Sequence, residues 1–411
     1  MEDLRGQPCV LLKFGEMALK GRNRPQFVSV LERNLRRSCR DLGPLEVRHR
    51  GGVLIVSGGE PRDELVARCL DLPGVSVVQP ALRCERDVST AADAAVALLE
   101  GMPGRTFAVR ARRRDKTFPL RSIELATVIG DAVRRRLELD VDLRSPDLEV
   151  HVEVDRRELL VSGEKLRGAG GLPVGSSGRA LVLLSGGLDS PVAAYRMMKR
   201  GLRCDFVHFS GRPFTGPESV YKAYALVGQL DRFQGGSRLW VVSFGAAQRR
   251  LATAGAGPLQ VLSQRRLMMK VASELAGREG CEALVSGDSL GQVASQTLAN
   301  LAVVEDAAEL PLLRPLIDRD KQEIVQIAQR LGTYDISILP DEDCCQLFAS
   351  RVAVTRGRGD DLRAIERTAD IEELVDTLVE SAELYRPRRD ESRTTLAVPG
   401  PGSSGDRATA S

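Results

Sequence analysis

The sequence has few aromatic residues, no long apolar run and no cysteines at a metal-binding spacing. Aromatic side chains make up 4% of the 411 residues, so the cores must be largely aliphatic. No apolar run approaches the roughly 18 residues that a membrane-spanning helix needs, and the opening MEDLRGQP lacks the apolar segment of a signal peptide. The eight cysteines form no C-x-x-C or other paired metal spacing. These absences favour a cytoplasmic protein with reduced thiols and no membrane segment.

Strong charge of one sign is also missing. The net charge is only +3, which alone gives no argument for a nucleic-acid partner. The distribution is more informative, because arginines gather in residues 1–50 and 105–136. A local basic surface can bind a phosphate backbone. On charge alone, solvated helix faces and loops explain these arginines equally well.

The most informative stretch is residues 180–199, ALVLLSGGLDSPVAAYRMMK. A short uncharged aliphatic run predicts a buried parallel strand, and apolar residues at helical spacing follow the glycine turn. A strand, a tight turn and a helix in this order point backbone N–H groups and the positive end of the helix dipole at one spot. That spot suits phosphate or pyrophosphate.

The side chains of this turn fit the same interpretation. Gly186 and Gly187 let the backbone approach an anion closely, and Ser185 and Ser190 add hydroxyl donors. Asp189 is suited to a Mg²⁺ ion that bridges phosphate oxygens. The Walker sequence is absent, and SGGLDS resembles instead the pyrophosphatase loop of ATPases that cleave between the α and β phosphates. The alternative is an ordinary βα turn whose glycines only permit the bend.

Strands and helices alternate beyond this loop, which predicts a doubly wound parallel sheet of the α/β class. The expected strands are residues 204–209, 239–244 and 283–286, and the expected helices are residues 219–230, 259–276 and 321–331. Ligands in such sheets bind at the carboxyl ends of the strands. The candidates at those ends are the SGGLDS loop and Leu183, Leu184, His208, Phe209, Gly287, Asp288 and Ser289. For His208, a strand-end histidine with satisfied hydrogen bonds is the alternative.

Two smaller α+β segments precede the sheet. A hairpin is predicted at Gly51–Gly52 in the first, and a basic loop, residues 112–119, lies in the second. Residues 163–179 are rich in glycine and lack apolar periodicity, as in a domain linker. From residue 357 the chain is charged, with one amphipathic helix expected over 371–384, and the composition after Pro387 is typical of disorder.

Several sequence blocks resemble one family in order and spacing. LLKFGEMALKGRNRPQF resembles its N-terminal ferredoxin-like domain, and RRRDKTFPLRS with VDLRSPDLEVHVEV resembles a THUMP domain. SGGLDSPVA, ALVSGDSLGQVASQT, LLRPLIDRDKQEI and LGTYDISILPDEDCC complete the likeness. Over roughly residues 9–350 the chain resembles the ThiI family of tRNA 4-thiouridine synthases, without the rhodanese domain that some members carry.

The resemblance implies a domain plan. It consists of a ferredoxin-like domain (1–80), a THUMP RNA-binding domain (81–165), a linker (166–178), a PP-loop ATP pyrophosphatase domain (179–355), and a C-terminal helix with a disordered tail (356–411). It also implies the reaction: the O4 atom of uridine 8 of tRNA attacks the α phosphate of ATP, pyrophosphate leaves, and a persulfide sulfur displaces AMP.

The family pattern assigns roles to individual residues. The implied ATP contacts are Leu183, Leu184, Ser185, Gly186, Gly187, Asp189, Ser190, His208, Phe209, Arg265, Gly287 and Gln296. Backbone groups of Leu183, Leu184, His208 and Phe209 would flank the adenosine. The Phe209 ring could also stack on the adenine, and Gln296 is expected in a helix. On charge alone, Arg266 is as good a candidate for the nucleotide contact as Arg265, and only the family pattern favours Arg265. Lys321 is suited to neutralising the departing pyrophosphate. The expected RNA contacts are Arg112, Arg113, Lys116 and Phe118.

The sulfur-handling residue is expected in the acidic stretch DEDCC. The motif aligns best with Cys344, and Cys345 is the runner-up. Acidic neighbours raise a thiol pKa, which argues mildly against a reactive thiolate there. The implied cofactors are ATP and Mg²⁺, and the implied partners are tRNA, a cysteine desulfurase as persulfide donor and a second copy in a homodimer.

Two other functions remain open from the sequence. One is another ATP pyrophosphatase, such as an amidotransferase-type synthetase, although no glutaminase is present. The other is a catalytically inactive tRNA-binding protein, which the intact SGGLDS with Asp189 argues against. Sulfur supply for the thiazole of thiamine is a further family role that the sequence does not decide.

Overall fold

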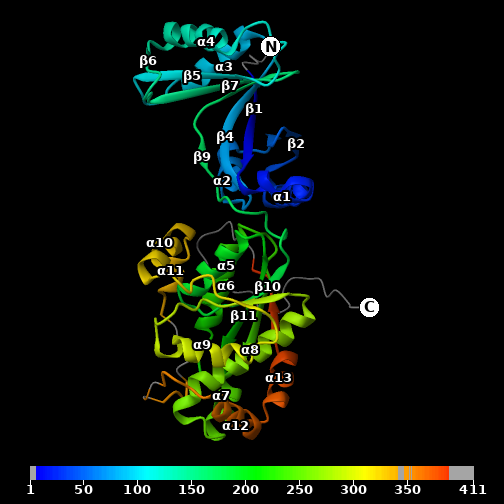
Figure 1. Cartoon of the computed structure of the whole chain (residues 1–411), viewed down its shortest axis with the longest axis vertical. Helices are drawn as coiled ribbons and strands as arrows, with labels where there is room; N and C mark the ends of the chain where they lie inside the picture. The colour runs from blue at the N-terminus through cyan, green and yellow to red at the C-terminus, as the bar shows by residue number, and fades with distance from the viewer. Residues whose placement is uncertain (1–5, 341–346, 351, 353, 388–411) are drawn as a thin grey trace. The chain divides into compact units, whose positions relative to one another are not determined.

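The computed structural model describes residues 6–340, 347–350, 352 and 354–387. It contains two compact units, residues 1–173 and residues 174–411 (Figure 1). Among the residues described, no helix is both long enough and apolar enough to cross a membrane.

The described part of the first unit is built on one continuous nine-stranded sheet. Its order is β2-β3-β1-β4-β8-β7-β5-β6, and β9 pairs with β4 off this path. The strands are β1 (Gln7–Phe14), β2 (Leu45–Arg50), β3 (Val53–Gly58), β4 (Val75–Cys84), β5 (Thr106–Arg113), β6 (Asp140–Val141), β7 (Leu148–Val154), β8 (Leu159–Ser162) and β9 (Leu166–Arg167). Strand β4 pairs with β1 on one side and with β8 on the other. The boundary expected after residue 80 therefore falls inside a strand that both halves share.

Helices bury two aliphatic cores against this sheet. They are α1 (Arg24–Ser38), α2 (Arg62–Asp71), α3 (Val88–Leu99) and α4 (Ser122–Leu137). Leu31, Leu35 and Leu65 belong to the first core, and Leu125 and Ile129 belong to the second. The predicted hairpin is confirmed, since β2 and β3 pair antiparallel across Gly51 and Gly52, whose φ angles are +53° and +92°.

The segment expected as a linker is ordered at its start. Strand β9 pairs antiparallel with β4, and the Gly74 N–H donates to the Gly170 carbonyl at 2.8 Å. Leu172 and Val174 are buried. Backbone hydrogen bonds hold this glycine-rich segment against β4. Because such bonds do not depend on apolar side chains, the sequence shows no periodicity that would predict them.

The second unit has a six-stranded sheet of order β14-β13-β10-β11-β12-β15 within its described residues. The strands are β10 (Arg179–Leu183), β11 (Arg203–Ser210), β12 (Leu239–Ser243), β13 (Ala283–Val285), β14 (Leu312–Leu313) and β15 (Glu383–Tyr385). All neighbouring pairs are parallel except β12 with β15. The predicted doubly wound α/β class is confirmed.

Helices cover both faces of this sheet (Figure 1). They are α5 (Asp189–Met198), α6 (Glu218–Asp231), α7 (Gly245–Thr253), α8 (Gln260–Arg278), α9 (Leu298–Glu305), α10 (Lys321–Leu331), α11 (Tyr334–Ser337), α12 (Gly359–Ala369) and α13 (Ile371–Glu380). One core joins the sheet to α5, α6 and α10, and the other joins it to α7, α8, α12 and α13.

The C-terminal part of the described chain differs from expectation. One helix was expected over 371–384, whereas the structure has α12, α13 and the edge strand β15. Leu362 and Leu374 are buried in the same core as α8. The domain expected to end at residue 355 thus shares its core with the residues that follow. The tail expected to be disordered, 388–411, lies outside the described residues.

The order of the sheet determines where a ligand can bind. From β10 the chain continues to β11 and β12 on one side, then crosses to β13 and β14 on the other. The carboxyl ends of β10 and β13 therefore flank a topological switch point. Open α/β sheets bind their ligands in the crevice outside such a point.

Candidate functional site

The SGGLDS loop lies between β10 and α5, and its serines fix its shape. Ser190 Oγ accepts a hydrogen bond from the Ser185 N–H at 3.0 Å and lies 3.1 Å from Ser185 Oγ. Ser190 is buried, whereas Ser185 and Gly187 are exposed. The Ser337 hydroxyl donates to the Gly187 carbonyl at 3.4 Å. Ser190 therefore closes the loop from inside, and Ser185 and Gly187 are the parts that solvent or a ligand reaches.

Gly287 brings the end of β13 against the first turn of α5. A Cβ atom at Gly287 would lie 2.7 Å from the backbone nitrogen of Ser190 and 2.9 Å from the carbonyl carbon of Asp189. Both are backbone atoms, which cannot move aside as the end of a flexible side chain can. Only glycine permits this approach, so the two walls of the switch point touch backbone to backbone.

Asp189 is joined to side chains from two other elements. Lys321 Nζ lies 3.0 Å from Asp189 Oδ1, and Gln292 Nε2 donates to Asp189 Oδ2 at 3.3 Å. Lys321 is the first residue of α10, whose start is fixed by a capping box between Asp320 and Glu323. The pair is only partly buried, since half of the Lys321 side chain is exposed. An ammonium group and a carboxylate thus meet beside the loop.

Asp288 is a buried acceptor at the end of β13. It accepts from Arg265 at 2.6 Å, from the Ser286 hydroxyl at 2.8 Å and from the Gln296 amide at 3.2 Å. Burial would raise its pKa, but the charge of Arg265, the Ser286 hydrogen bond and the charge of Arg314 outweigh burial and hold the pKa below its usual value. Asp288 is therefore a carboxylate at neutral pH.

The structure gives different partners to Arg265 and Arg266, the two arginines that charge alone could not distinguish. Arg265 points to Asp288 and also donates to the Ser295 carbonyl at 3.2 Å. Arg266 is 2% exposed and pairs with Glu366 of α12 at 2.6 Å. Arg266 therefore ties α8 to α12, and Arg265 belongs to the switch point. Gln296 lies in a 3₁₀ turn, Ala294–Gln296, rather than in the expected helix.

The β11 residues assigned to ATP have their side chains engaged elsewhere. Both ring nitrogens of His208 have partners, the Leu184 carbonyl at 2.9 Å and Ser219 Oγ at 3.2 Å. Phe209 is 5% exposed and packs edge-on against Phe244, with ring centroids 5.2 Å apart. The His208 side chain thus fits the alternative of a satisfied histidine, and the Phe209 ring lies in the core rather than open for stacking. The expected contacts of ATP with the backbone groups of these residues stay a prediction. Leu183 ends β10, and Leu184 follows it with its side chain buried.

The basic loop of the first unit divides into surface residues and supporting residues. Arg112 and Lys116 are exposed. Arg113 donates to the carbonyls of Phe118 and Leu120, at 3.2 and 3.1 Å. Phe118 is 5% exposed, with the Arg86 guanidinium 5.3 Å from its ring centroid. Arg113 and Phe118 therefore shape the loop from inside, and the expected RNA contacts of the loop stay a prediction.

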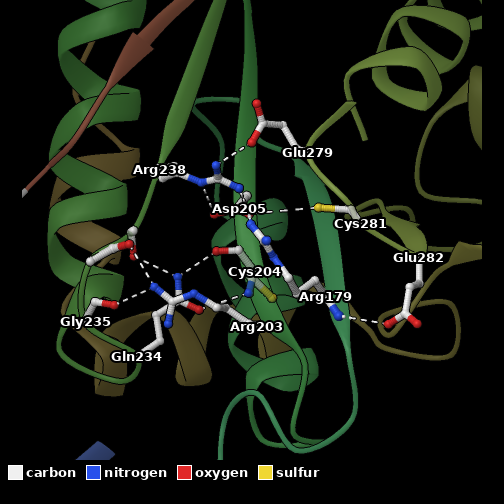
Figure 2. Close-up of polar contacts among 12 residues, drawn as sticks. Arg179, Arg203, Cys204, Asp205, Gln234, Gly235, Arg238, Glu279, Cys281 and Glu282 are labelled. Carbon is white, nitrogen blue, oxygen red and sulfur yellow. Dashed lines mark hydrogen bonds and ion pairs between the residues drawn. The ribbon is translucent and has the colours of Figure 1, made fainter. Parts of the chain in front are cut away.

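Polar contacts at the amino ends of the strands of the second sheet form a separate network, which Figure 2 shows. Asp205, 1% exposed, pairs with Arg179 at 2.6 Å and with Arg238 at 2.7 Å. Arg238 continues the network to Glu279. The thiol of Cys281 lies 3.9 Å from Asp205 Oδ2. This network ties together the amino ends of the strands, away from the SGGLDS loop.

All six cysteines within the described residues are buried. Burial raises the pKa of Cys9 to about 12 and of Cys39, Cys84 and Cys281 to about 11, and it also raises the pKa of Cys69 and Cys204. These thiols stay protonated and are poor nucleophiles. Cys344 and Cys345 lie outside the described residues. In the same described part, no group of three or more metal-ligating side chains comes together.

Sequence reasoning missed several residues of the site. Gln292 and Arg314 were not predicted, and Ser286 was predicted only as the last residue of a strand, whereas Asp288 was a candidate because of its place after that strand. Arg314 lies 3.5 Å from Asp288 and follows β14, a strand of two residues that periodicity cannot detect. The usable signal was the position of Asp288 directly after a predicted parallel strand.

Comparisons with known proteins agree along the chain. The family described as "Thiamine biosynthesis protein (ThiI)" matches residues 175–371, the THUMP domain matches 85–164 and the ThiI ferredoxin-like domain matches 9–78. The "Probable tRNA sulfurtransferase" of Nocardia farcinica is 54% identical, over 93% of this chain and 94% of that protein. The protein of the same name from Geobacillus kaustophilus is 38% identical, over 91% and 94%.

A solved structure gives the same result. It is described as a 4-thiouridine synthetase–RNA complex with bound ATP, and it matches with a TM-score of 0.87 at 31% identity, covering 92% of this chain and 99% of the other. The likeness in sequence and fold thus extends over nearly the whole chain. The chain belongs to the ThiI family of tRNA sulfurtransferases.

Proposed function

We propose that this chain transfers sulfur to uridine 8 of tRNA in an ATP-dependent reaction that gives 4-thiouridine. The observation that carries the proposal is the SGGLDS loop at the switch point, with Asp189 and Lys321 3.0 Å apart beside it. The likeness to a 4-thiouridine synthetase that was solved with RNA and ATP supports the same substrate and cofactor.

ATP would bind with its phosphates on the loop. The exposed Ser185 would offer its hydroxyl, and the exposed Gly187 and the N-terminus of α5 would offer N–H donors, to the phosphates. Arg265 and Gln296 would contact the nucleotide from the β13 side. Gln296 Oε1 is buried and has no hydrogen-bond partner among the described residues. A buried acceptor of this kind needs a donor, which a nucleotide amino or hydroxyl group would supply.

The residues beside the loop also fit a Mg²⁺ ion bound with the nucleotide. Mg²⁺ usually takes one or two carboxylates and completes its shell with phosphate oxygens and water. Asp189 is the carboxylate at the start of α5, whereas Asp288 is surrounded by Arg265, Ser286, Gln296 and Arg314. Asp189 would hold the ion, which would neutralise charge on the phosphates.

The reaction would proceed in two displacements. The uracil O4 attacks the α phosphorus, the O4–P bond forms, the bond to the β phosphate breaks and pyrophosphate leaves. Lys321 would neutralise the charge that develops on this leaving group. The terminal sulfur of a persulfide then attacks C4, and AMP leaves with the former O4 oxygen. Adenylation is needed because a carbonyl oxygen leaves poorly and a phosphate ester leaves well.

The persulfide would be carried by Cys344, with Cys345 as the alternative. The six buried cysteines have raised pKa values and lack the thiolate that sulfur chemistry needs. That elimination supports the DEDCC stretch. A cysteine desulfurase would donate the sulfur, and a second thiol would release it by forming a disulfide. We further propose a homodimer that acts in the cytoplasm.

Thiamine synthesis is a second candidate role. The observation that favours it is the description of the matching family as a thiamine biosynthesis protein. The same persulfide would then serve a second acceptor.

The decisive experiment compares bulk tRNA from a deletion strain with tRNA from strains complemented by the wild-type chain or by Asp189→Asn. Mass spectrometry should find 4-thiouridine only in the wild-type strain. If 4-thiouridine persists in the deletion strain, the chain has another function. Growth of the same strains without thiamine tests the second role.

A further inference from the structure

Two half-exposed aromatic rings meet in the second unit. The ring centroids of Phe214 and Phe348 are 5.4 Å apart, with an interplanar angle of 87°. Phe214 is 41% exposed and Phe348 is 42% exposed. The guanidinium carbon of Arg249 lies 5.3 Å from the centroid of the Phe214 ring. Only 4% of the residues in this chain are aromatic, and an exposed aromatic pair beside an arginine is a feature typical of an interaction site.

The backbone beyond β11 and β12 holds Phe214 in place. Its N–H donates to the Gly211 carbonyl at 2.9 Å, and the Gly245 N–H donates to the Arg212 carbonyl at 3.0 Å. A Cβ atom at Gly245 would lie 2.8 Å from the Phe214 ring and 2.6 Å from the Arg212 carbonyl oxygen. Gly245 is the first residue of α7, the helix that carries Arg249. The ring and the guanidinium are therefore positioned by the same close contact.

Phe348 is tied to the helix that carries Arg265. The carbonyl of Leu347 accepts from Gln264 Nε2 at 2.9 Å, and Gln264 precedes Arg265 in α8. Phe348 has φ +60°, a left-handed conformation that is an outlier for a bulky residue. Such backbone strain concentrates at functional sites. Both rings thus lie beyond the carboxyl ends of the strands, and the SGGLDS loop lies at the same end of the sheet.

We propose that Phe214, Phe348 and Arg249 form a platform that stacks a nucleobase of the tRNA segment carrying the target uridine. The proposal rests on the proposed function and deepens it. Unpaired RNA bases stack on aromatic rings and on arginine planes, which is how proteins hold single-stranded segments. Two perpendicular rings form a corner in which a base lies flat on one ring and meets the other at its edge.

Arg249 favours a nucleic acid over an apolar protein segment as the occupant. It is exposed and has no ion-pair partner among the described residues. A guanidinium beside an open aromatic face provides a planar cation for a base or its phosphate. The three side chains are base-positioning residues, and they are separate from Asp189 and Lys321.

The test measures tRNA-dependent pyrophosphate release by the full-length protein. Phe214→Ala and Phe348→Ala should each raise the KM for tRNA roughly 5- to 150-fold, the range for loss of one base–aromatic stack. The affinity for Mg-ATP should not change. Phe214→Tyr, which keeps the flat ring, should behave as wild type, and Phe214→Leu, which keeps only apolar bulk, should behave as Phe214→Ala. Tyr221→Ala is the matched control, because Tyr221 is an aromatic residue of similar exposure, 39%, on α6.

A second arm separates RNA from a protein partner. Thiolation is measured once with a cysteine desulfurase and cysteine, and once with inorganic sulfide. The platform predicts the same defect with both sulfur sources. A defect seen only with the desulfurase would identify a protein-docking surface and overturn the proposal, as would wild-type kinetics for Phe214→Leu. If the wild-type protein released no pyrophosphate with tRNA, the proposed function would fail first, which keeps the two failures apart.

Discussion

At the scale of single residues, Asp189 and Lys321 carry the main chemical argument. They are 132 positions apart in the sequence and 3.0 Å apart in the structure. Asp189→Asn keeps the size of the side chain and removes its charge, so Mg-ATP should lose its carboxylate ligand while the fold remains. We expect tRNA-dependent pyrophosphate release to be abolished and tRNA binding to stay within about twofold of wild type, because phosphate contacts elsewhere dominate RNA affinity.

The control for that variant is Asp318→Asn, which removes a carboxylate that is 69% exposed near the start of α10. It should release pyrophosphate at the wild-type rate. A wild-type rate for Asp189→Asn instead would show that the SGGLDS loop does not hold the reacting phosphates.

The two vicinal cysteines give the second prediction at this scale. Cys344→Ser should leave pyrophosphate release intact and eliminate 4-thiouridine, because adenylation precedes sulfur transfer and needs no thiol. Cys345→Ser should do less damage. Both outcomes can be read from one assay that follows pyrophosphate and thiolated tRNA together. If the effects of the two variants are exchanged, the sulfur carrier is Cys345, and normal thiolation by the double variant would exclude both cysteines as carriers.

At the scale of secondary-structure elements, the contact between β13 and α5 is the most sensitive. Gly287→Ala would place a methyl group 2.7 Å from the Ser190 nitrogen, and neither backbone segment can turn aside. The end of β13 must then move away from the loop, taking Asp288 with it. We expect Mg-ATP binding to weaken at least tenfold with little loss of tRNA affinity. Gly277→Ala, in the last turn of α8 with no atom in the way, is the control and should bind ATP as wild type does.

The opposite ends of the strands predict how stability depends on pH. Burial would raise the pKa of Asp205, but hydrogen bonds and charge from Arg238 and Arg179 outweigh it, so its pKa in the folded state lies below its usual value. The ion pairs therefore stabilise the fold above about pH 4, the pKa of an unfolded aspartate, and this stabilisation is lost as pH falls through the lower folded-state value.

Asp205→Asn should lower the free energy of unfolding at pH 7 by up to about 3–5 kcal/mol, since it removes one partner of a buried charge cluster. The difference from wild type should stay constant down to about pH 4 and shrink below it. Urea unfolding followed by the fluorescence of Trp240, the single tryptophan, which lies on β12 next to this network, measures the difference. A gap that widens with acid would contradict the assignment.

These elements also show what the sequence could and could not predict. Helix α10 was expected over 321–331 and is found there, because an N-cap Asp320 and a left-handed Gly332 delimit it. Strand β14 has two residues, too few for any period, and Arg314 after it was missed in consequence. The roles of Arg265 and Arg266 depend on which face of α8 meets Asp288 and which meets Glu366, and those partners are distant in the sequence.

At the scale of the whole molecule, the ferredoxin-like and THUMP domains share one continuous sheet in the described part of the first unit. Strand β4 pairs with β1 over residues 7–14 and with β8 over residues 159–162. A protein cut between residues 80 and 81 would lose this shared strand, so neither piece should fold. Residues 1–173 contain the complete sheet and both of its cores, and should fold as a unit.

That unit should bind tRNA in a salt-dependent way through the exposed part of its basic loop. The logarithm of affinity should fall linearly with the logarithm of salt concentration, and each lost phosphate contact should reduce the slope by about 0.7–0.9. The double variant Arg112→Glu with Lys116→Glu removes two exposed cations. It should flatten the slope by the amount that corresponds to one or two phosphate contacts. Filter binding across a salt series, on the full chain and on residues 1–173, measures this slope. Arg113 is unsuitable for this test, because it holds the Phe118 and Leu120 carbonyls and its loss would deform the loop itself.

The matched control is Arg33→Glu with Arg40→Glu, which makes the same charge change at exposed positions around the end of α1. If the basic loop contacts the phosphate backbone, this control lowers affinity through the general field of the unit but leaves the slope nearly unchanged. Equal slopes for both double variants would mean that net charge rather than the loop sets the affinity. Binding by residues 1–173 that does not depend on salt would refute a phosphate contact of any kind, since counterion release accompanies every such contact.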